Sequence, residues 1–398
     1  MNAAPGAEAG AFEHNDGRVT TNGRGTDPRD GRPYRVVQWT TGFVGRSALR
    51  YLLDRPGFQV VGAKCHSPRK EGRDVADLVR RPPIGVRATC DESALLALDA
   101  DCVVFTPHDS GQRDPTVPGT LSHEHFQTAL RILRSGKNVV SSLCPPTHFR
   151  HLADPELFMG EIEAACRTGE SSIHFTGVDP GFFTDALAVA VSSGVGRVDR
   201  IRTWEILDYF AIPYTGGPLT SLFGRRPEEL QEGGHESWIR EGWGGVPHLL
   251  ADAFGQQLDA IDVDFDYWLA DESYETPGGR LIEKGTIGAY IFDQHGVAGG
   301  RRIFTTTHVN RMGPHTGPDW PTVGHDGGYR IDIEGSTPLR VDIPLGNEGG
   351  RGSALADAGE VTAARLVNCI VPLINSSPGY RTFLDLGQIT SSLGQLSA

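Results

Sequence analysis

The sequence predicts an α/β fold with a doubly wound parallel sheet, followed by an α+β region built on a mixed sheet. Three observations lead to this prediction. Residues 34–54 read as a strand, a tight turn and a helix, and short apolar strands then alternate with helices up to residue 177. From residue 198 to 344 the strands are longer and alternate polar with apolar side chains. The first pattern is typical of an open parallel sheet covered on both faces, and the second of an antiparallel or mixed sheet.

The first strand, turn and helix have the features of a dinucleotide-binding turn. Residues 34–39 suit a buried strand, and apolar residues recur at helical spacing from residue 46. Gly42 lets the backbone approach a diphosphate, and Gly45 lets the helix pack closely on the strand. The helix N-terminus would face the phosphates with unpaired N–H groups. We therefore predict that the turn binds the cofactor through Thr41, Gly42, Phe43, Val44 and Gly45.

The loop after the second strand, residues 58–64, indicates which dinucleotide is preferred. In this architecture the loop faces the adenosine ribose, where an acidic residue would hold the 2′-hydroxyl of NAD. This chain instead has His66, Ser67, Arg69 and Lys70 there. Cations and a hydroxyl suit a 2′-phosphate, which predicts NADP(H) as the preferred cofactor, with NAD(H) tolerated. The alternative is that Arg69 and Lys70 are solvated loop charges.

Polar residues also follow the next strands of the predicted parallel sheet, at the edge where ligands bind in this architecture. Thr106, Pro107 and His108 follow one strand, and His108 either lines the nicotinamide site or caps a loop. Ser141 and Ser142 end the next strand. They either bond the nicotinamide ribose or carboxamide, or are buried hydroxyls bonded to backbone. In this part of the chain we expect helices at 74–78, 91–98, 121–135 and 155–168, and strands at 86–89, 101–106, 137–142 and 171–177.

The rest of the chain predicts a second region and a return to the first. We expect long strands at residues 198–207, 285–292, 302–312 and 328–344, and helices at 243–254 and 359–374. The chain would then divide into a disordered tail (1–32), a dinucleotide-binding domain (33–178), an α+β substrate and dimerisation domain (179–351), and a C-terminal helix returning to the first domain (352–398).

Composition and charge exclude several classes of protein. The 398 residues are 38 % hydrophobic and include 51 Gly and 26 Pro, which fits a loop-rich globular enzyme better than a helical bundle. The net charge of −13 argues against a nucleic-acid surface, and no run is long and apolar enough to cross a membrane. The six cysteines are scattered without a CxxC pair, so we expect reduced, mostly buried thiols in a cytoplasmic protein.

Six short motifs occur in order along the chain: QWTTGFVGRSAL, GRDVADL, SGKNVVSS, FTGVDPGF, GPDWP and GGYRIDIEG. With them the chain resembles the NAD(P)H-dependent amine dehydrogenase family. That family is close to 2,4-diaminopentanoate dehydrogenase and shares the N-terminal domain type of dihydrodipicolinate reductase. The resemblance implies a Rossmann domain, an α+β substrate and dimer domain, and a homodimer. It also implies interconversion of a ketone plus ammonia with an amine, using NADH or NADPH.

Two departures from the family pattern affect these expectations. Thr40 stands where the family often has glycine, which implies that the cofactor loop sits differently. The dihydrodipicolinate reductase signature, a His-His-Arg run followed by Lys and a Ser-Gly-Thr loop, is absent, which argues against a role in the lysine pathway.

The resemblance also implies a catalytic role for Glu124. Reductive amination needs deprotonated ammonia and a hydroxide that leaves as water, and one carboxylic acid with a raised pKa can serve both steps. In the amine dehydrogenases a glutamate near the start of the helix before GKNVV plays this part, and the matching residue is Glu124. The alternative is a favourable acid in a helix's first turn. His108 is the second catalytic candidate.

Two further expectations concern the crossing between the domains and metals. The resemblance places Asp179 and Pro180 beside the nicotinamide, and the alternative is a simple chain reversal. No metal is expected, because His123 and His125 diverge on a helix and HExxH is absent.

Three functions are compatible with these observations. The first acts on a small carbonyl or amine substrate with ammonia. The second is an alcohol or semialdehyde dehydrogenase that needs no ammonia, and the third is a non-catalytic dinucleotide sensor. Ketone reduction with and without ammonium would separate the first two, while tight NADPH binding without turnover would favour the third.

Overall fold

The structure is a computed structural model. It describes residues 31–107, 123–143, 155–210, 222–230, 234–313, 316–317, 319–325, 327–346 and 353–392. The chain divides into two units, Met1–Pro33 and Tyr34–Ala398, and the second unit contains every helix and strand that the structure describes.

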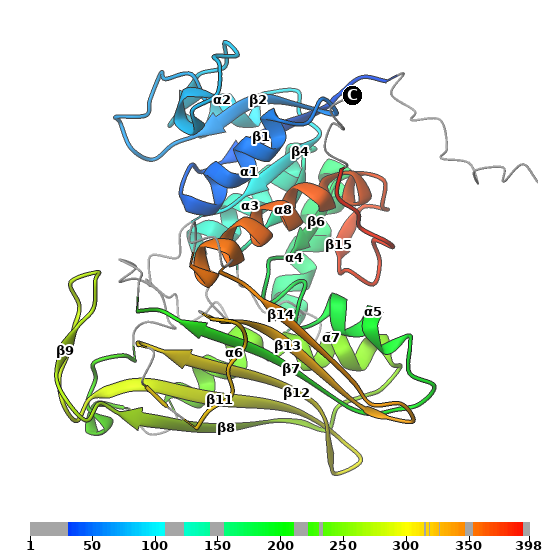
Figure 1. Cartoon of the computed structure of the whole chain (residues 1–398). Helices are drawn as coiled ribbons and strands as arrows, with labels where there is room; N and C mark the ends of the chain where they lie inside the picture. Colours follow the sequence, from blue (N-terminus) through cyan, green and yellow to red (C-terminus); the bar gives the residue numbers. More distant parts are fainter. Residues whose placement is uncertain are drawn as a thin grey trace, which may run out of the picture. The chain divides into compact units, whose positions relative to one another are not determined.

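The first part of this second unit is a seven-stranded sheet, in the order β15-β6-β5-β4-β1-β2-β3, whose neighbouring strands all pair in parallel (Figure 1). This arrangement confirms the predicted parallel sheet. Its strands are β1 (Tyr34–Trp39), β2 (Phe58–Lys64), β3 (Ala88–Thr89), β4 (Cys102–Phe105), β5 (Asn138–Ser141), β6 (Ser172–Phe175) and β15 (Gly379–Arg381). Its helices are α1 (Phe43–Leu53), α2 (Glu92–Leu96), α3 (His123–Arg134), α4 (Pro155–Gly169) and α8 (Ala354–Ile374), with a 3₁₀ turn η1 (Asp77–Val79).

Helices cover both faces of this sheet because consecutive strand residues point to opposite sides. Val37 and Val103 pack into one apolar core with residues of α3 and α4. Their neighbours Val36 and Val104 pack into a second core with residues of α1 and α8. All four valines are fully buried, so both faces of the sheet contribute to the hydrophobic stabilisation.

The second part is a six-stranded mixed sheet, in the order β14-β13-β7-β12-β11-β8. The central strand β7 (Val198–Asp208) runs parallel to β12 (Arg301–Arg311) and antiparallel to β13 (Gly327–Gly335), which confirms the mixed sheet. The other strands are β8 (Ala260–Leu269), β11 (Ile287–Ala298) and β14 (Leu339–Pro344), with a separate pair β9 (Tyr274–Glu275) and β10 (Leu281–Ile282). The helical segments are α5 (Ala186–Ser192), α6 (Gly234–Trp243), α7 (Gly245–Ala253) and a 3₁₀ turn η3 (Pro227–Glu229).

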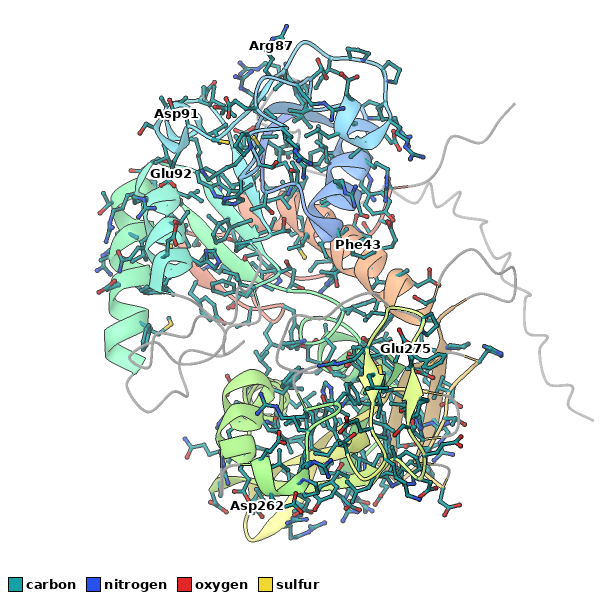
Figure 2. The ribbon with its side chains drawn as sticks, turned by 90° about the vertical axis from the view of Figure 1, so that its left-hand side faces the viewer. Phe43, Arg87, Asp91, Glu92, Asp262 and Glu275 are labelled. Atoms are coloured by element: carbon teal, nitrogen blue, oxygen red, sulfur yellow. The ribbon has the colours of Figure 1, made fainter. Side chains whose placement is uncertain are left out.

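One sequence expectation about this second part was wrong, and two of its elements were not predicted. The segment 328–344 is a hairpin of β13 and β14 rather than one strand, because the chain turns at residues 336–338. The helix expected at 243–254 is α7, whereas α6, which ends at Trp243, was not predicted. Strand β8 was not predicted, since acidic residues alternate along its middle and give it a polar face. Asp262 on this strand is labelled in Figure 2.

The end of the chain completes the first sheet. Strand β15 pairs with β6 at the sheet edge, and α8 packs along α1. Three side chains of α1 converge on the Glu360 carboxylate of α8: the Ser47 hydroxyl donates at 2.6 Å, Arg50 Nη2 at 2.7 Å and the Tyr51 hydroxyl at 2.9 Å. Burial and the Glu360 charge raise the pKa of Tyr51 to about 12, so this hydroxyl remains a donor.

Phe43, the first residue of α1, also contacts α8. A Cβ atom added at Gly359 would lie 2.2 Å from Phe43 Cε1, so a larger residue at that position would require the ring to move. Phe43, which is labelled in Figure 2, is 52 % exposed. Within the described residues, no helix is long and apolar enough to cross a bilayer.

Candidate cofactor site and active site

The turn between β1 and α1 offers free amide groups at an open surface. Gly42 precedes the helix without a side-chain cap, and the first turn of α1 contains no acidic residue. The first amides of a helix have no intrahelical acceptor, so they face outward with a partial positive charge. No heavy atom lies within 4 Å of the position that a Cβ on Gly42 would occupy. This geometry can accept a diphosphate close to the backbone.

Thr40 adopts the left-handed backbone conformation, with φ +84°, at the position where the family often has glycine. A non-glycine residue there costs roughly 1–3 kcal/mol. Its side-chain contacts offset this cost, because the Thr40 hydroxyl lies 3.0 Å from the Thr106 hydroxyl and donates to the Thr106 carbonyl. The Gln38 amide donates to the Thr40 carbonyl at 3.0 Å. A threonine therefore forms this turn with the help of the residue that follows β4.

Position 45 must also be a glycine, because the Thr40 carbonyl and the Thr106 hydroxyl lie close to it. A Cβ atom at this position would lie 2.5 Å from the Thr40 carbonyl oxygen and 2.9 Å from the Thr106 hydroxyl. The helix therefore packs on the strand ends as closely as the sequence predicted.

The loop after β2 reaches back to the turn. Lys70 Nζ donates to the Thr41 carbonyl at 2.8 Å and to the Thr41 hydroxyl at 3.0 Å, so the structure brings these two predicted residues together. Arg69 is exposed, and its backbone N–H donates to the Ser67 hydroxyl at 3.3 Å. Of the two cations, Lys70 is thus hydrogen-bonded to the turn, while the exposed Arg69 can reach a ligand in solvent.

The start of α3 lies within electrostatic reach of this loop. Partial burial lowers the pKa of His66, as do the charges of Lys64 and His125, while the charge of Glu124 opposes them. Glu124 itself is exposed in the first turn of α3. No described contact joins Glu124 to Asp179 or Pro180. Its catalytic role therefore stays a prediction.

The other predicted residues have different surroundings. Ser141 is buried, and its hydroxyl donates to the Phe105 carbonyl at 2.9 Å and accepts from the Leu143 amide at 3.2 Å. This is the backbone-bonded alternative, and of the serine pair only Ser142 is partly exposed. Pro107 is half-buried beyond the end of β4. His108 lies outside the described residues.

The crossing at Asp179 and Pro180 leads into a buried ion triad. The Asp179 carboxylate lies 3.1 Å from His308 Nε2 on β12, and His308 Nδ1 lies 3.2 Å from the Glu205 carboxylate on β7. The indole N–H of Trp243 donates to Asp179 at 2.9 Å. The Tyr329 hydroxyl donates to Glu205 at 2.7 Å. The Thr184 hydroxyl also donates to Asp179.

The charges of this triad are coupled because it is shielded from solvent. The side chains of His308 and Asp179 have no exposed surface. Burial alone would lower the pKa of His308, but the charges of Asp179 and Glu205 outweigh it and raise the pKa to about 9. The imidazole is therefore protonated at neutral pH. It stacks on Phe292, with ring centres 4.5 Å apart.

Sequence reasoning missed His308 and Glu205. A single histidine in a Thr-rich strand resembles an ordinary core residue, as His174 proves to be: it is buried and bonded to the Arg381 carbonyl at 2.8 Å. Glu205 did carry a signal. It occupies an inward position of β7, in line with the buried Ile201 and Leu207, where an unpaired charge would be costly.

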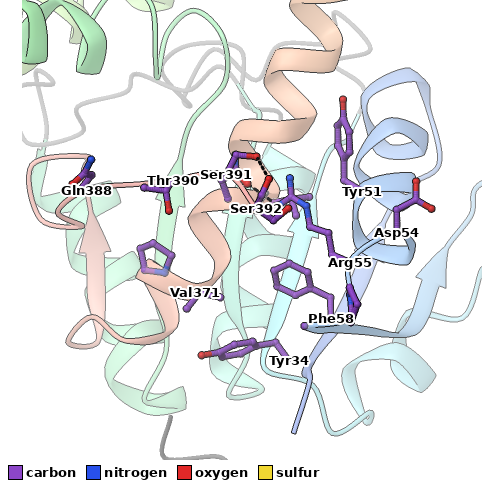
Figure 3. Close-up of a pocket in the computed structure, with 15 residues that line it drawn as sticks. Tyr34, Tyr51, Asp54, Arg55, Phe58, Val371, Gln388, Thr390, Ser391 and Ser392 are labelled. Atoms are coloured by element: carbon purple, nitrogen blue, oxygen red, sulfur yellow. Dashed lines mark hydrogen bonds between the residues drawn. The ribbon is translucent and has the colours of Figure 1, made fainter. Parts of the chain in front are cut away.

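A separate cavity lies at the amino-terminal ends of β1 and β2. It has a volume of about 680 Å³ and is lined by Tyr34, Arg55, Phe58 and residues of α8 and the C-terminal segment (Figure 3). The predicted cofactor turn is at the carboxyl end of β1, and none of the predicted site residues lines this cavity. We therefore do not assign it to the candidate active site.

Comparisons with known proteins agree with the resemblance seen in the motifs. Residues 182–398 match the family described as "2,4-diaminopentanoate dehydrogenase C-terminal domain". An amine dehydrogenase from Streptomyces virginiae is 33 % identical over 371 residues, covering 91 % of this chain and 98 % of that protein. The solved amine dehydrogenase from Mycobacterium smegmatis has the same fold, with a TM-score of 0.67, 19 % identity, and coverage of 90 % and 97 %.

The ion triad predicts a pH dependence of stability. The folded pKa of His308, about 9, lies above its ordinary value of 6.5. Its stabilising contribution is thus complete below about pH 6.5 and is lost as pH rises through about 9. We expect the free energy of unfolding to fall by up to roughly 3 kcal/mol across this window. Thermal or urea unfolding between these pH values measures it.

Two variants test the origin of this effect. His308→Asn should lower stability at pH 6.5 and flatten the decline. His174→Asn is the matched control, because burial lowers the pKa of His174 to about 4 and it stays neutral over the whole window. An identical decline in wild type and His308→Asn would show that another group titrates.

Proposed function

This chain belongs to the amine dehydrogenase family, and we propose that it interconverts a ketone or aldehyde plus ammonia with an amine, using a nicotinamide dinucleotide. Family membership makes it an oxidoreductase. The observation that best supports the proposal is the turn at residues 40–45, whose open amides and close helix packing fit the diphosphate of such a cofactor. When bound, the nicotinamide would supply or accept the hydride.

The residues of the turn would hold and orient the cofactor. The α1 amides bind the diphosphate, and Lys70, held on Thr41, adds a positive charge beside it. Ser67 and Arg69 would contact the adenosine ribose, with Arg69 favouring a 2′-phosphate. Thr40 is hydrogen-bonded to Thr106 and α1 to α8, so contacts within the chain hold the turn in the conformation that would receive the ligand.

Glu124 would move the protons that amination requires. Its carboxylate takes a proton from ammonium, and the ammonia released adds to the carbonyl carbon. The resulting carboxylic acid then returns the proton to the hydroxyl group of the carbinolamine, which leaves as water. Glu124 lies in the first turn of α3, where it can reach solvent ammonium. The iminium carbon produced is the atom that receives hydride.

The ion triad would position the substrate side of the site. Asp179 and Pro180 leave the carboxyl end of β6, an edge where ligands bind in parallel sheets. Because His308 and Trp243 hold Asp179 from the second sheet, the crossing is fixed relative to both sheets. These residues are fully or nearly buried, so their proposed role is positioning rather than proton transfer.

A homodimer is part of the proposal. Apolar contacts to α5, α6 and α7 lie on one face of the second sheet, while Trp204, Ile206 and Val309 form a cluster on the opposite face. That cluster is buried within the chain, and the Arg202–Asp293 ion pair on the same face is only partly exposed. The support for a dimer built through this sheet is therefore the family resemblance. We expect light scattering to give about twice the chain mass of 43.0 kDa. A 43.0 kDa particle at micromolar concentration would contradict this.

The preference for NADP(H) is tested by separating the two cations. Arg69→Ala should weaken NADPH binding about tenfold and leave NADH affinity unchanged, since the lost contact is to the 2′-phosphate. Lys70→Ala should weaken both cofactors, because Lys70 supports the shared turn. Arg73→Ala, which removes an exposed cation from the same loop, is the control. If NADH binds as tightly as NADPH and Arg69→Ala changes neither, the preference is wrong.

Amination itself is tested with Glu124→Gln, which keeps the size of the side chain but removes its titrating group. We expect amine formation from a ketone and ammonium to fall by on the order of 10²-fold or more. NADPH affinity should hardly change. The unfolding free energy should fall by only about 0.3–1 kcal/mol, the usual contribution of a first-turn acid.

The outcomes distinguish the competing functions. A variant that folds, binds NADPH and turns over at the parent rate would remove Glu124 from the mechanism, and His108 would be tested next. A parent enzyme that reduces the ketone equally well without ammonium would instead be a carbonyl reductase. Tight NADPH binding with no turnover of any carbonyl or amine would favour a sensor.

A further inference from the structure

Two cysteines and a glutamate meet beyond the carboxyl ends of β2 and β3. Lys64 pairs with Thr89 in the parallel ladder, so the next residues, Cys65 and Cys90, lie side by side. The Cys65 amide donates to the Thr89 carbonyl at 2.9 Å, and Lys64 Nζ donates to the Cys90 carbonyl at 3.1 Å. Glu71 arrives from the intervening loop, and its carboxylate accepts the Cys90 N–H. Backbone contacts thus hold all three residues in place.

The distances among the three donor atoms suit one metal ion. The two sulfur atoms are 3.5 Å apart, and Cys65 Sγ lies 3.9 Å from Glu71 Oε2. A disulfide bond would need about 2.05 Å between the sulfurs. Tetrahedral zinc, with Zn–S of about 2.3 Å and Zn–O of about 2.0 Å, places two sulfurs about 3.8 Å apart and a sulfur and an oxygen about 3.5 Å apart. The cluster is therefore close to a metal-binding geometry.

The chemistry of the donors selects the class of metal. Two thiolates favour soft or borderline ions such as Zn²⁺ over Mg²⁺ or Ca²⁺, and a carboxylate completes a site of three protein ligands. Cys90 and Glu71 are exposed, which leaves the fourth position to water. Cys65 is buried, so one ligand is fixed in the protein interior.

We propose that Cys65, Glu71 and Cys90 bind one thiophilic divalent cation of the zinc class, which ties loop 65–71 to the end of β3. Because cysteines bind metals as thiolates, metal binding must release thiol protons, and the affinity should rise with pH. The proposal does not depend on the reaction assigned to the enzyme.

The test uses the full chain, reduced and stripped of metal with a chelator. Cobalt(II) is added first, because thiolate ligands give it an intense charge-transfer absorption, and zinc is then used to displace it. We expect saturation at one ion per chain. Cys90→Ser and Glu71→Gln should each lower the cobalt affinity, by on the order of 100-fold and tenfold respectively.

Cys166→Ala is the matched control, because it removes a thiol from α4, outside the cluster, and should leave the titration unchanged. Both cluster variants alter exposed residues, so folding is expected to persist and is checked by circular dichroism. Absence of a charge-transfer band in the reduced wild type would overturn the proposal. So would an equal band in Cys90→Ser, or loss of both thiols to a disulfide without metal.

Discussion

His308 carries a positive charge between two buried carboxylates, and this ion triad holds the segment that leaves the first sheet against the strands of the second. Asp179 belongs to the crossing, Glu205 to β7 and His308 to β12. The two ion pairs of His308 therefore join three distant parts of the sequence. Removing one partner from such a buried group leaves an uncompensated charge, which costs about 3–5 kcal/mol. The arrangement of the two sheets is therefore tied to the protonation of one imidazole. The hydrogen bonds from Thr184 and Tyr329 satisfy the remaining carboxylate oxygens of Asp179 and Glu205, and Trp243 donates to the Asp179 oxygen that faces His308.

The cofactor turn depends on a smaller polar contact of the same kind. Thr40 adopts a conformation that usually requires glycine, and it does so because Thr106, just beyond the neighbouring strand, accepts a hydrogen bond from its hydroxyl. The resemblance implied that this substitution would move the loop. In this chain, the side chain that replaces glycine supplies a hydrogen bond that glycine lacks. Thr106 was singled out in the sequence as a ligand contact, and the structure gives it this supporting role as well.

The fold could be predicted because periodicity is a local property. The strand around Val103 is a continuous apolar run, and the long strands alternate, so each sheet type follows from a short window of sequence. Strand β8 escaped prediction because its alternating acids resemble a solvated loop. The break at residues 336–338 was missed because strong alternation on either side concealed a turn.

The candidate site was less accessible to such reasoning because its contacts join residues far apart in the chain. The cofactor turn could be located from Gly42 and Gly45, which lie within one motif. The bond between Lys70 and Thr41 could not, because the two residues are separated by a whole strand and helix. In the sequence, the strands β7, β8 and β11 of the second sheet lie between Asp179 and His308. Only the folded chain shows that these groups are neighbours.

The way in which the chain end completes the first sheet has a consequence for folding during synthesis. Residues 34–175 emerge from the ribosome first and contain six of the seven strands, but α8 and β15 are made only after the entire second sheet. Until then the apolar core that Leu366 and Ile370 of α8 complete is missing that helix, and β6 has an unpaired edge. The nascent first domain would therefore expose apolar surface and a strand edge, both of which promote association with other chains. This domain can therefore be completed by α8 and β15 only when the finished chain leaves the ribosome.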